Sequence, residues 1–223
     1  MSSAKKFYVP INLNNVPAID EFIGHDGDLD QLWRSLQPQN SNMRKVVILH
    51  GLGGIGKTQL AIRFARIHKY DFTAIFWLNG KDRETLIRSL VAIAPTLPEA
   101  QIPSVAIGNT EDSNELERRA EKVLRWLATE GNSRWLLIFD NVDQYPEIEN
   151  DNAYDVSEFF PPADHGSIII TTRLPRLIEL GISHPVPKLN TEEAVKLLIK
   201  STGRTFKTDE RSDFKDPGEF IIL

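Results

Sequence analysis

Apolar residues gather along the chain in four short runs, and most segments between them show apolar positions at helical spacing. The runs occupy residues 44–50, 73–79, 134–140 and 167–172. Near-continuous apolar character over so few residues is typical of strands that are buried on both faces, as in a parallel sheet. We expect a fifth strand over residues 185–189, at an edge of the sheet, because its two prolines cannot donate to a neighbouring strand.

The segments between the runs predict helices. In residues 27–36 the apolar side chains fall at i, i+3, i+4 and i+7, which is the spacing of one helical face. Four further helices are expected, one from Lys57 to about His68 and three that begin after the capping residues Asp82, Asp112 and Asn190. Alternating strands and helices predict an α/β fold, a five-stranded parallel sheet with helices on both faces.

Three regions differ in composition. Residues 1–20 are polar and interrupted by proline, which predicts an extended N-terminal segment along the surface. Residues 21–203 carry the alternating strands and helices and form the expected domain, with a long surface connection over residues 95–111. Residues 204–223 form a mixed-charge tail that ends in four apolar residues.

The strongest chemical signal lies between the first apolar run and the helix that follows it. Residues 51–58 read G-L-G-G-I-G-K-T, a complete G-x-x-x-x-G-K-T phosphate-binding loop. Its glycines let backbone N–H groups approach an anion, and the N-terminus of the next helix adds its positive end. We expect Lys57 to bind the β and γ phosphates and the Thr58 hydroxyl to bind Mg²⁺. The sequence therefore predicts a nucleotide-binding site.

Two other strand ends carry candidate residues. Asp140 ends the third apolar run, where a carboxylate can hold Mg²⁺ opposite a phosphate loop. Asn141 cannot take up a proton, so Asp143 is the nearest candidate base for an attacking water, with a solvated loop acid as the alternative. Arg173 follows the fourth run and is expected to contact the γ phosphate, with an ordinary surface ion pair as the alternative.

Composition excludes several classes of function. The chain has 223 residues, of which 41% are hydrophobic and 26% charged, as in soluble globular proteins. Its net charge of −5 predicts no binding to nucleic acid or to an anionic membrane, and its lack of cysteine excludes disulfides and thiol chemistry. No apolar run approaches the ~18 residues of a membrane span and no secretory signal is present, so we expect a cytoplasmic protein.

Taken together, five segments in this order resemble the NB-ARC domain, the nucleotide-binding domain of STAND-class regulatory ATPases such as fungal NOD-like receptors. They are F-I-G-H at 22–25, the phosphate loop at 51–58, F-W-L-N at 76–79, W-L-L-I-F-D-N-V-D at 135–143 and G-S-I-I-I-T-T-R at 166–173. Residues 189–198 are similar to the stretch that follows the last of these in the family. The resemblance covers about residues 18–203.

The resemblance implies a P-loop NTPase fold in which strand 167–172 lies between the phosphate-loop strand and strand 134–140. It implies that Phe22 and Ile23 flank the adenine of ADP or ATP, that Thr58 and Asp140 hold Mg²⁺, and that Arg173 senses the γ phosphate. The implied phosphate contacts are Gly53, Gly54, Ile55, Gly56, Lys57, Thr58 and Gln59. It further implies signal transduction: ADP marks the resting state, and exchange for ATP changes contacts with other protein chains, including other NB-ARC chains.

Three features depart from the family pattern. His25 stands where the family usually has arginine, and Asn141 stands where many members have a second aspartate, which argues against fast hydrolysis. The helical and winged-helix subdomains that follow in the family have no counterpart in residues 204–223. We therefore expect this tail to be the truncated start of the next helical subdomain.

Three hypotheses for function follow from these residues. The leading one is a regulatory switch that binds ADP and ATP with Mg²⁺ and hydrolyses ATP slowly. The second is an active AAA-like ATPase, which needs a well-aimed base. The third is a truncated interaction decoy that binds nucleotide weakly.

Overall fold

A computed structural model describes residues 7–11, 16, 22–38, 43–98, 112–144 and 153–202. In these residues, five parallel strands form one sheet in the order β2-β3-β4-β1-β5. The strands are β1 (Lys45–His50), β2 (Ala74–Asn79), β3 (Trp135–Asp140), β4 (Ser167–Thr172) and β5 (Ile182–Pro185). The predicted five-stranded parallel sheet is confirmed, and β4 lies between β1 and β3 as the resemblance implied.

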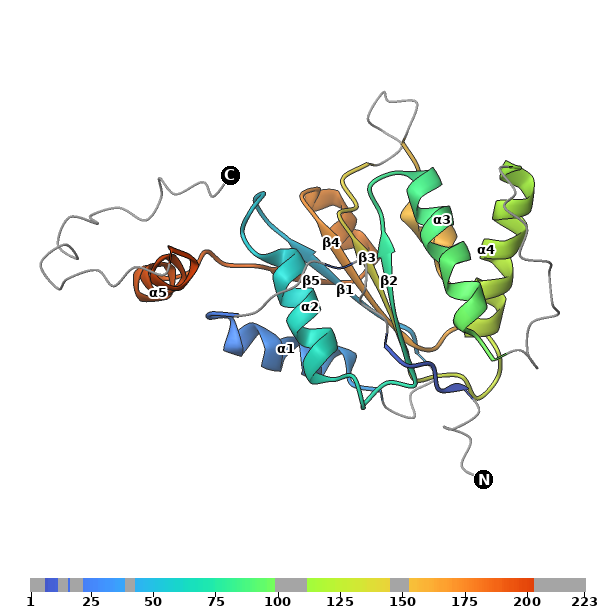
Figure 1. Cartoon of the computed structure of the whole chain (residues 1–223), viewed down its shortest axis with the longest axis horizontal. Helices are drawn as coiled ribbons and strands as arrows, with labels where there is room; N and C mark the ends of the chain where they lie inside the picture. Colours follow the sequence, from blue (N-terminus) through green and yellow to red (C-terminus); the bar gives the residue numbers. More distant parts are fainter. Residues whose placement is uncertain are drawn as a thin grey trace, which may run out of the picture.

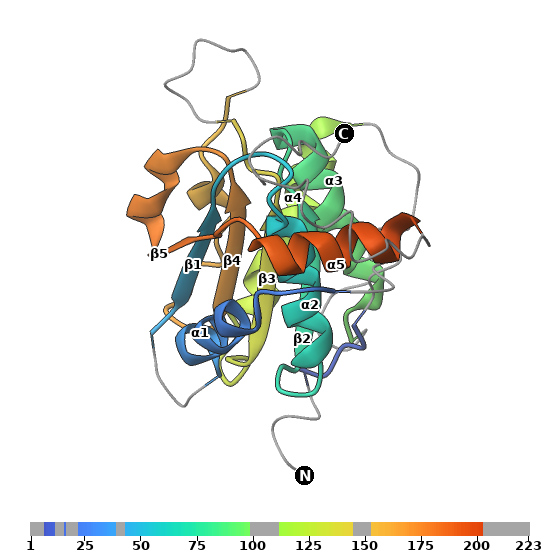
Figure 2. The same ribbon diagram turned by 90° about the vertical axis from the view of Figure 1, so that its left-hand side faces the viewer.

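Helices cover both faces of the sheet (Figure 1). They are α1 (Asp26–Leu36), α2 (Lys57–Ile67), α3 (Arg83–Ile93), α4 (Ser113–Leu127) and α5 (Thr191–Thr202), with short 3₁₀ helices η2 (Ala94–Thr96), η4 (Val156–Phe159) and η5 (Pro175–Leu180). Figure 2 shows the sheet from the side of α1 and α2, with α3 and α4 behind it. α5 lies beyond α1 and α2, farther from the sheet (Figure 1).

Alternate side chains of each strand enter two separate cores. In β3, Leu136 and Ile138 pack under α1 and α2, whereas Trp135, Leu137 and Phe139 pack under α3 and α4. This follows from the two-residue period of a strand, which sends successive side chains to opposite faces. Because both faces are buried, the central strands are apolar along most of their length, as predicted from their sequences.

The predicted caps are present. Asp82 accepts a hydrogen bond from the Thr85 backbone N–H at 2.8 Å, and Asp112 accepts one from Asn114 at 3.0 Å. Asn190 and Glu193 form a reciprocal capping box at the start of α5, with distances of 2.9 and 3.0 Å.

The edge strand lies earlier in the sequence than predicted. β5 covers 182–185 instead of 185–189 and pairs with β1 from Val47↔Ile182 to His50↔Pro185. The prediction of its edge position is correct, but its start was missed because Ile182 and Ser183 are exposed and give no apolar run. Pro187 lies in the link that leads to α5.

Two other expectations change. Phe7 and Val9 are buried in the core under α3 and α4, and the Val9 N–H donates to the Thr73 carbonyl at 2.8 Å, so this part of the N-terminal segment packs against the domain. The expected connection over 95–111 begins with the 3₁₀ helix η2, while residues 99–111, like the tail 204–223, lie outside the described residues. None of the helices in the described part of the chain has the length and apolar character to cross a membrane.

Candidate functional site

The carboxyl ends of β1, β3 and β4 bring three distant segments together at one edge of the sheet. Because these strands are parallel neighbours, the loop after β1 lies beside the loops after β3 and β4. Between them is a hollow of about 270 Å³, which we call the phosphate hollow. It is lined by Gly53, Gly54, Ile55, Gly56, Lys57, Thr58, Gln59, Asn141, Asp143, Thr171, Thr172 and Arg173. All the predicted phosphate contacts lie in this hollow.

The loop from β1 to α2 has the backbone of an anion site. Gly54 and Gly56 adopt φ values of 75° and 102°, in the left-handed region that favours glycine. Gly56 is the N-cap residue of α2 and has no side chain to accept from the first N–H groups of the helix. Those N–H groups and the positive end of α2 are therefore available to an anion in the hollow.

Lys57 is the buried cation of the hollow. Only 9% of the residue is exposed, and its Nζ donates to the carbonyl oxygens of Gly51 and Leu52, each at 2.8 Å. Burial lowers the pKa of Lys57, and Arg173 acts in the same direction, whereas the carboxylates of Asp143 and Asp140 act against it. An anionic ligand would offset the cost of burying this charge.

Thr58 and Asp140, the two predicted Mg²⁺ ligands, are in direct contact. The Thr58 hydroxyl donates to Oδ1 of Asp140 at 2.8 Å, and the Thr171 hydroxyl donates to the same oxygen at 2.6 Å. Burial raises the pKa of Asp140, and the two hydroxyl hydrogen bonds oppose that shift. A carboxylate and a hydroxyl are the hard oxygen donors that suit Mg²⁺, so these residues fit the ion.

The described residues contain no group of three or more His, Cys, Asp or Glu that could hold a metal ion. A cation beside Asp140 would therefore need oxygen ligands from a bound phosphate or from water. This is the usual situation of Mg²⁺ in sites where one or two protein side chains hold the ion together with a nucleotide.

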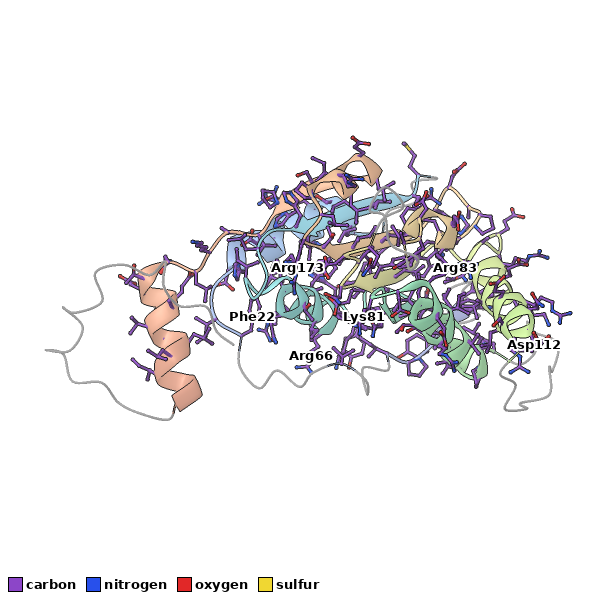
Figure 3. All side chains as sticks on the ribbon, turned by 90° about the horizontal axis from the view of Figure 1, so that it is seen from above. Phe22, Arg66, Lys81, Arg83, Asp112 and Arg173 are labelled. Carbon is purple, nitrogen blue, oxygen red and sulfur yellow. The ribbon has the colours of Figure 1, made fainter. Side chains whose placement is uncertain are left out.

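Arg173 and Asp143 are paired with each other. The Arg173 backbone N–H donates to Oδ1 of Asp143 at 2.7 Å, and its side-chain Nε lies 3.2 Å from Oδ2. The guanidinium also lies over the phosphate loop, because a β-carbon on Gly53 would be 3.3 Å from its Cζ. Figure 3 shows Arg173 beside the start of α2. The ion pair, considered above as the alternative for Arg173, thus exists inside the hollow.

The loop that carries Asp143 is held against β4. Asn141 adopts a φ of 63°, and its backbone N–H donates to the Thr171 hydroxyl at 2.8 Å. The Val142 N–H donates to the Thr171 carbonyl at 2.9 Å, and the Thr172 hydroxyl donates to the Val142 carbonyl at 2.6 Å. Neither threonine was predicted from the sequence to belong to the site, since threonine in a buried strand is common in any sheet.

Phe22 and Ile23, expected beside adenine, do not line the phosphate hollow. Both are half-buried, and Phe22 packs against the core under α1 and α2, with its ring centroid 6.1 Å from that of His25. Their assignment to adenine therefore stays a prediction.

A second hollow of about 380 Å³, which we call the lateral hollow, lies beside the start of α1. It is lined by His25, Asp26, Gly27, Asp28, Pro187, Lys188, Asn190 and Glu193. His25 connects it to the phosphate loop, because its Nε2 lies 3.9 Å from where a β-carbon on Gly56 would be.

Asp28, in the wall of the lateral hollow, contacts two histidines, of which His25 also lines the hollow. Its carboxylate lies 2.8 Å from Nδ1 of His25 and 2.9 Å from Nε2 of His184. Both imidazoles are almost fully buried, with 5% and 4% of their side chains exposed. Sequence spacing could not indicate this cluster, because its members come from α1, the residue before it, and β5.

A protein-family model and a curated protein both match most of this chain. The NB-ARC domain family matches residues 25–205 of the chain. A curated protein of Hyaloscypha variabilis, described as a nucleotide-binding leucine-rich repeat (NLR)-like protein, is 28% identical over 179 residues. The alignment covers 75% of this chain but only 16% of that protein.

One solved structure with low sequence identity is similar to this chain in fold. The crystal structure of Cdc6p from Pyrobaculum aerophilum aligns with a TM-score of 0.55 at 13% identity, over 87% of this chain and 54% of that one. A STAND protein with a tetratricopeptide repeat sensor from Pyrococcus horikoshii aligns with a TM-score of 0.48 at 19% identity, over 92% of this chain and 29% of that one.

Proposed function

Since the chain belongs to the NB-ARC family, we propose that it is a regulatory switch that binds ADP and ATP together with Mg²⁺ and hydrolyses ATP slowly. The observation that carries the proposal is the phosphate hollow, where a buried lysine, the Thr58–Asp140 pair and Arg173 surround an uncapped helix start. In this proposal, residues 21–203 form the nucleotide-binding domain.

Each part of the hollow has a separate task in this proposal. The loop N–H groups and Lys57 bind the phosphates common to ADP and ATP. Thr58 and Asp140 hold Mg²⁺, which neutralises charge on the phosphate oxygens when bound. Arg173 contacts the γ phosphate and so distinguishes ATP from ADP.

Slow hydrolysis is supported by the state of the carboxylates. Asn141 cannot accept a proton from water, and one oxygen of the Asp143 carboxylate accepts the Arg173 backbone N–H, a hydrogen bond that does not depend on where the Arg173 side chain lies. Asp140 accepts two hydroxyl hydrogen bonds and is the proposed Mg²⁺ ligand. A carboxylate that is held by a backbone hydrogen bond or by Mg²⁺ is poorly placed to activate water, so the nucleotide state would persist long enough to act as a signal.

The output of the switch would be a change in contacts with other protein chains, including other NB-ARC chains, in the cytoplasm. Support comes from the description of the curated relative as NLR-like, and this chain spans only a small part of that protein.

Thermal unfolding of the protein with Mg-ADP, with Mg-ATP and without nucleotide tests the proposal, together with the rate of phosphate release. We expect both nucleotides to raise the melting temperature in a concentration-dependent way, and chelation of Mg²⁺ to reduce the effect. We expect turnover well below about 1 s⁻¹. Turnover at or above that rate would instead indicate an active ATPase, and no thermal response to either nucleotide would contradict the proposal.

A further inference from the structure

We propose that Asp143 is a positioning residue that sets the preference between ATP and ADP, because its carboxylate competes with the γ phosphate for Arg173. The inference rests on the proposed function, since it requires a nucleotide in the phosphate hollow. It replaces the role of base that the sequence suggested for Asp143.

Arg173 contacts the Asp143 carboxylate with both its backbone N–H and its side chain. Both oxygens of the Asp143 carboxylate are engaged, one by the Arg173 backbone N–H at 2.7 Å and the other by its Nε at 3.2 Å. A carboxylate and a phosphate offer a guanidinium the same kind of paired oxygen acceptors. A γ phosphate would therefore replace Asp143 as the partner of the side chain without a change in the type of interaction.

The two partners differ in their exposure and in how they are held. Asp143 has 25% of its side chain exposed, and its loop is tied to β4 through Val142 and Thr172. The Arg173 side chain is 63% exposed and lies over Gly53, with its Nη1 3.5 Å from where a β-carbon there would be. The carboxylate is thus the fixed partner, and the guanidinium can move between it and a phosphate on the loop.

The charges of the hollow make this competition selective. Lys57, Arg173 and Asp143 line the hollow, and the Asp140 carboxylate contacts two of its lining residues, Thr58 and Thr171. The Asp143 carboxylate is thus a negative charge in the wall of the hollow that the nucleotide phosphates would enter. ADP leaves the Arg173–Asp143 pair in place, whereas ATP brings its last phosphate next to that carboxylate and must take the arginine from it. Asp143 therefore penalises ATP more than ADP.

The experiment is a double-mutant cycle read as the ratio of ATP to ADP affinity. Calorimetry with Mg-ADP and Mg-ATP is performed on the wild type, Asp143→Asn, Arg173→Gln and the double variant. Asparagine keeps the shape of aspartate and an oxygen to accept from the Arg173 N–H, so the loop keeps its anchor. Asp164→Asn is the matched control, since it removes one exposed charge before β4, at the opposite end of that strand.

We expect Asp143→Asn to shift the affinity ratio toward ATP about tenfold, which is in the range of coupling between charged partners. In the Arg173→Gln background, the same substitution should shift it less than about threefold, because only direct repulsion remains. Asp164→Asn should leave the ratio unchanged. If the asparagine variant does not fold, Asp143→Ser gives the same comparison.

Two results would overturn the inference. An unchanged ratio in Asp143→Asn with a large fall in phosphate release would make Asp143 a base after all. An equal shift in both arginine backgrounds would show that Asp143 acts without Arg173. In both cases the wild type binds nucleotide and the proposed function survives, whereas a wild type that binds neither nucleotide would refute both proposals.

Discussion

The phosphate hollow and the lateral hollow lie on either side of Gly56, yet they are built from different parts of the fold. The phosphate hollow is formed at the ends of the three central strands, β1, β3 and β4. The lateral hollow is formed by the start of α1 and by the link from the edge strand β5 to α5. The position of the phosphate hollow is thus set by the parallel pairing of the strands, and that of the lateral hollow by the packing of α1 against the edge of the sheet.

The charged groups differ in the same way. In the phosphate hollow, Lys57 and Arg173 face a space that an anion can enter. In the lateral hollow, Asp28 is satisfied within the protein by His25 and His184. We therefore expect substitutions in the phosphate hollow to change nucleotide binding, and substitutions around Asp28 to change mainly stability.

The largest expected effect is that of Lys57→Ala. Loss of the charge-assisted contact with two phosphates should weaken Mg-ADP and Mg-ATP binding by about 100-fold, or about 3 kcal/mol. Calorimetry measures this, with the exposed Lys81→Ala as a control for loss of a lysine after β2. If the affinity of Lys57→Ala stays within about threefold of the wild type, the phosphate hollow is not where the nucleotide phosphates bind.

Asp140→Asn should abolish most of the Mg²⁺ dependence of binding while leaving the fold intact. Burial raises the pKa of Asp140, so its ionised form is costly in the protein without ligand, and the amide can still accept from both threonines. We expect about a tenfold loss of affinity in the presence of Mg²⁺ and little change in its absence. Titration of nucleotide with and without Mg²⁺ distinguishes this from a general loss, which would be equal in both conditions.

Asp28→Asn tests the lateral hollow. The amide would present a donor to one of the two imidazole N–H groups, and an unsatisfied buried donor costs about 1–3 kcal/mol. Chemical denaturation should show that loss in the free energy of unfolding, while calorimetry should show nucleotide affinity changed less than about threefold. A larger loss of affinity than of stability would place Asp28 in the binding site.

Asp82, the N-cap of α3, lies away from both hollows, and we expect Asp82→Ala to have the smallest effect. Removing the cap of α3 should cost about 1 kcal/mol of stability, with unchanged nucleotide binding. The hydrogen bonds from Thr85 lower the pKa of Asp82, so its contribution is present above the ordinary value of 3.8 and is lost as the pH falls through the lowered value. The difference between variant and wild type in urea denaturation should therefore be present at about pH 7 and should shrink as the pH falls below 3.8; a difference that does not shrink in acid would contradict this explanation.

The main residues of the phosphate hollow could be predicted from the sequence, whereas the contacts of Asp28 at the lateral hollow could not. Lys57, Thr58 and Asp140 follow strands whose apolar runs identify them, and parallel pairing then requires their ends to meet. Register also explains why Thr171 reaches Asp140, but threonine carries no distinctive signal. The contacts of Asp28 with His184 depend on how α1 packs against β5, and β5 itself has too few buried residues to stand out.

The pairing of Asp143 with Arg173 also lay beyond the sequence. Both residues were identified as candidates, and their positions after neighbouring strands placed them at one edge. Their mutual contact depends on the positive φ of Asn141, which turns the loop back onto β4. The side chain of a loop residue such as Asp143 can point in several directions. Its sequence position therefore could not tell whether it acts as a base or as the ion-pair partner of Arg173.

The most direct test of the account is to identify the nucleotide that the protein itself retains. The protein is purified without added nucleotide and denatured, and the released small molecules are separated by chromatography beside a Lys57→Ala sample. The account predicts close to stoichiometric ADP from the wild type and none from the variant. A wild type that releases no nucleotide and also fails to take up Mg-ADP or Mg-ATP would contradict it.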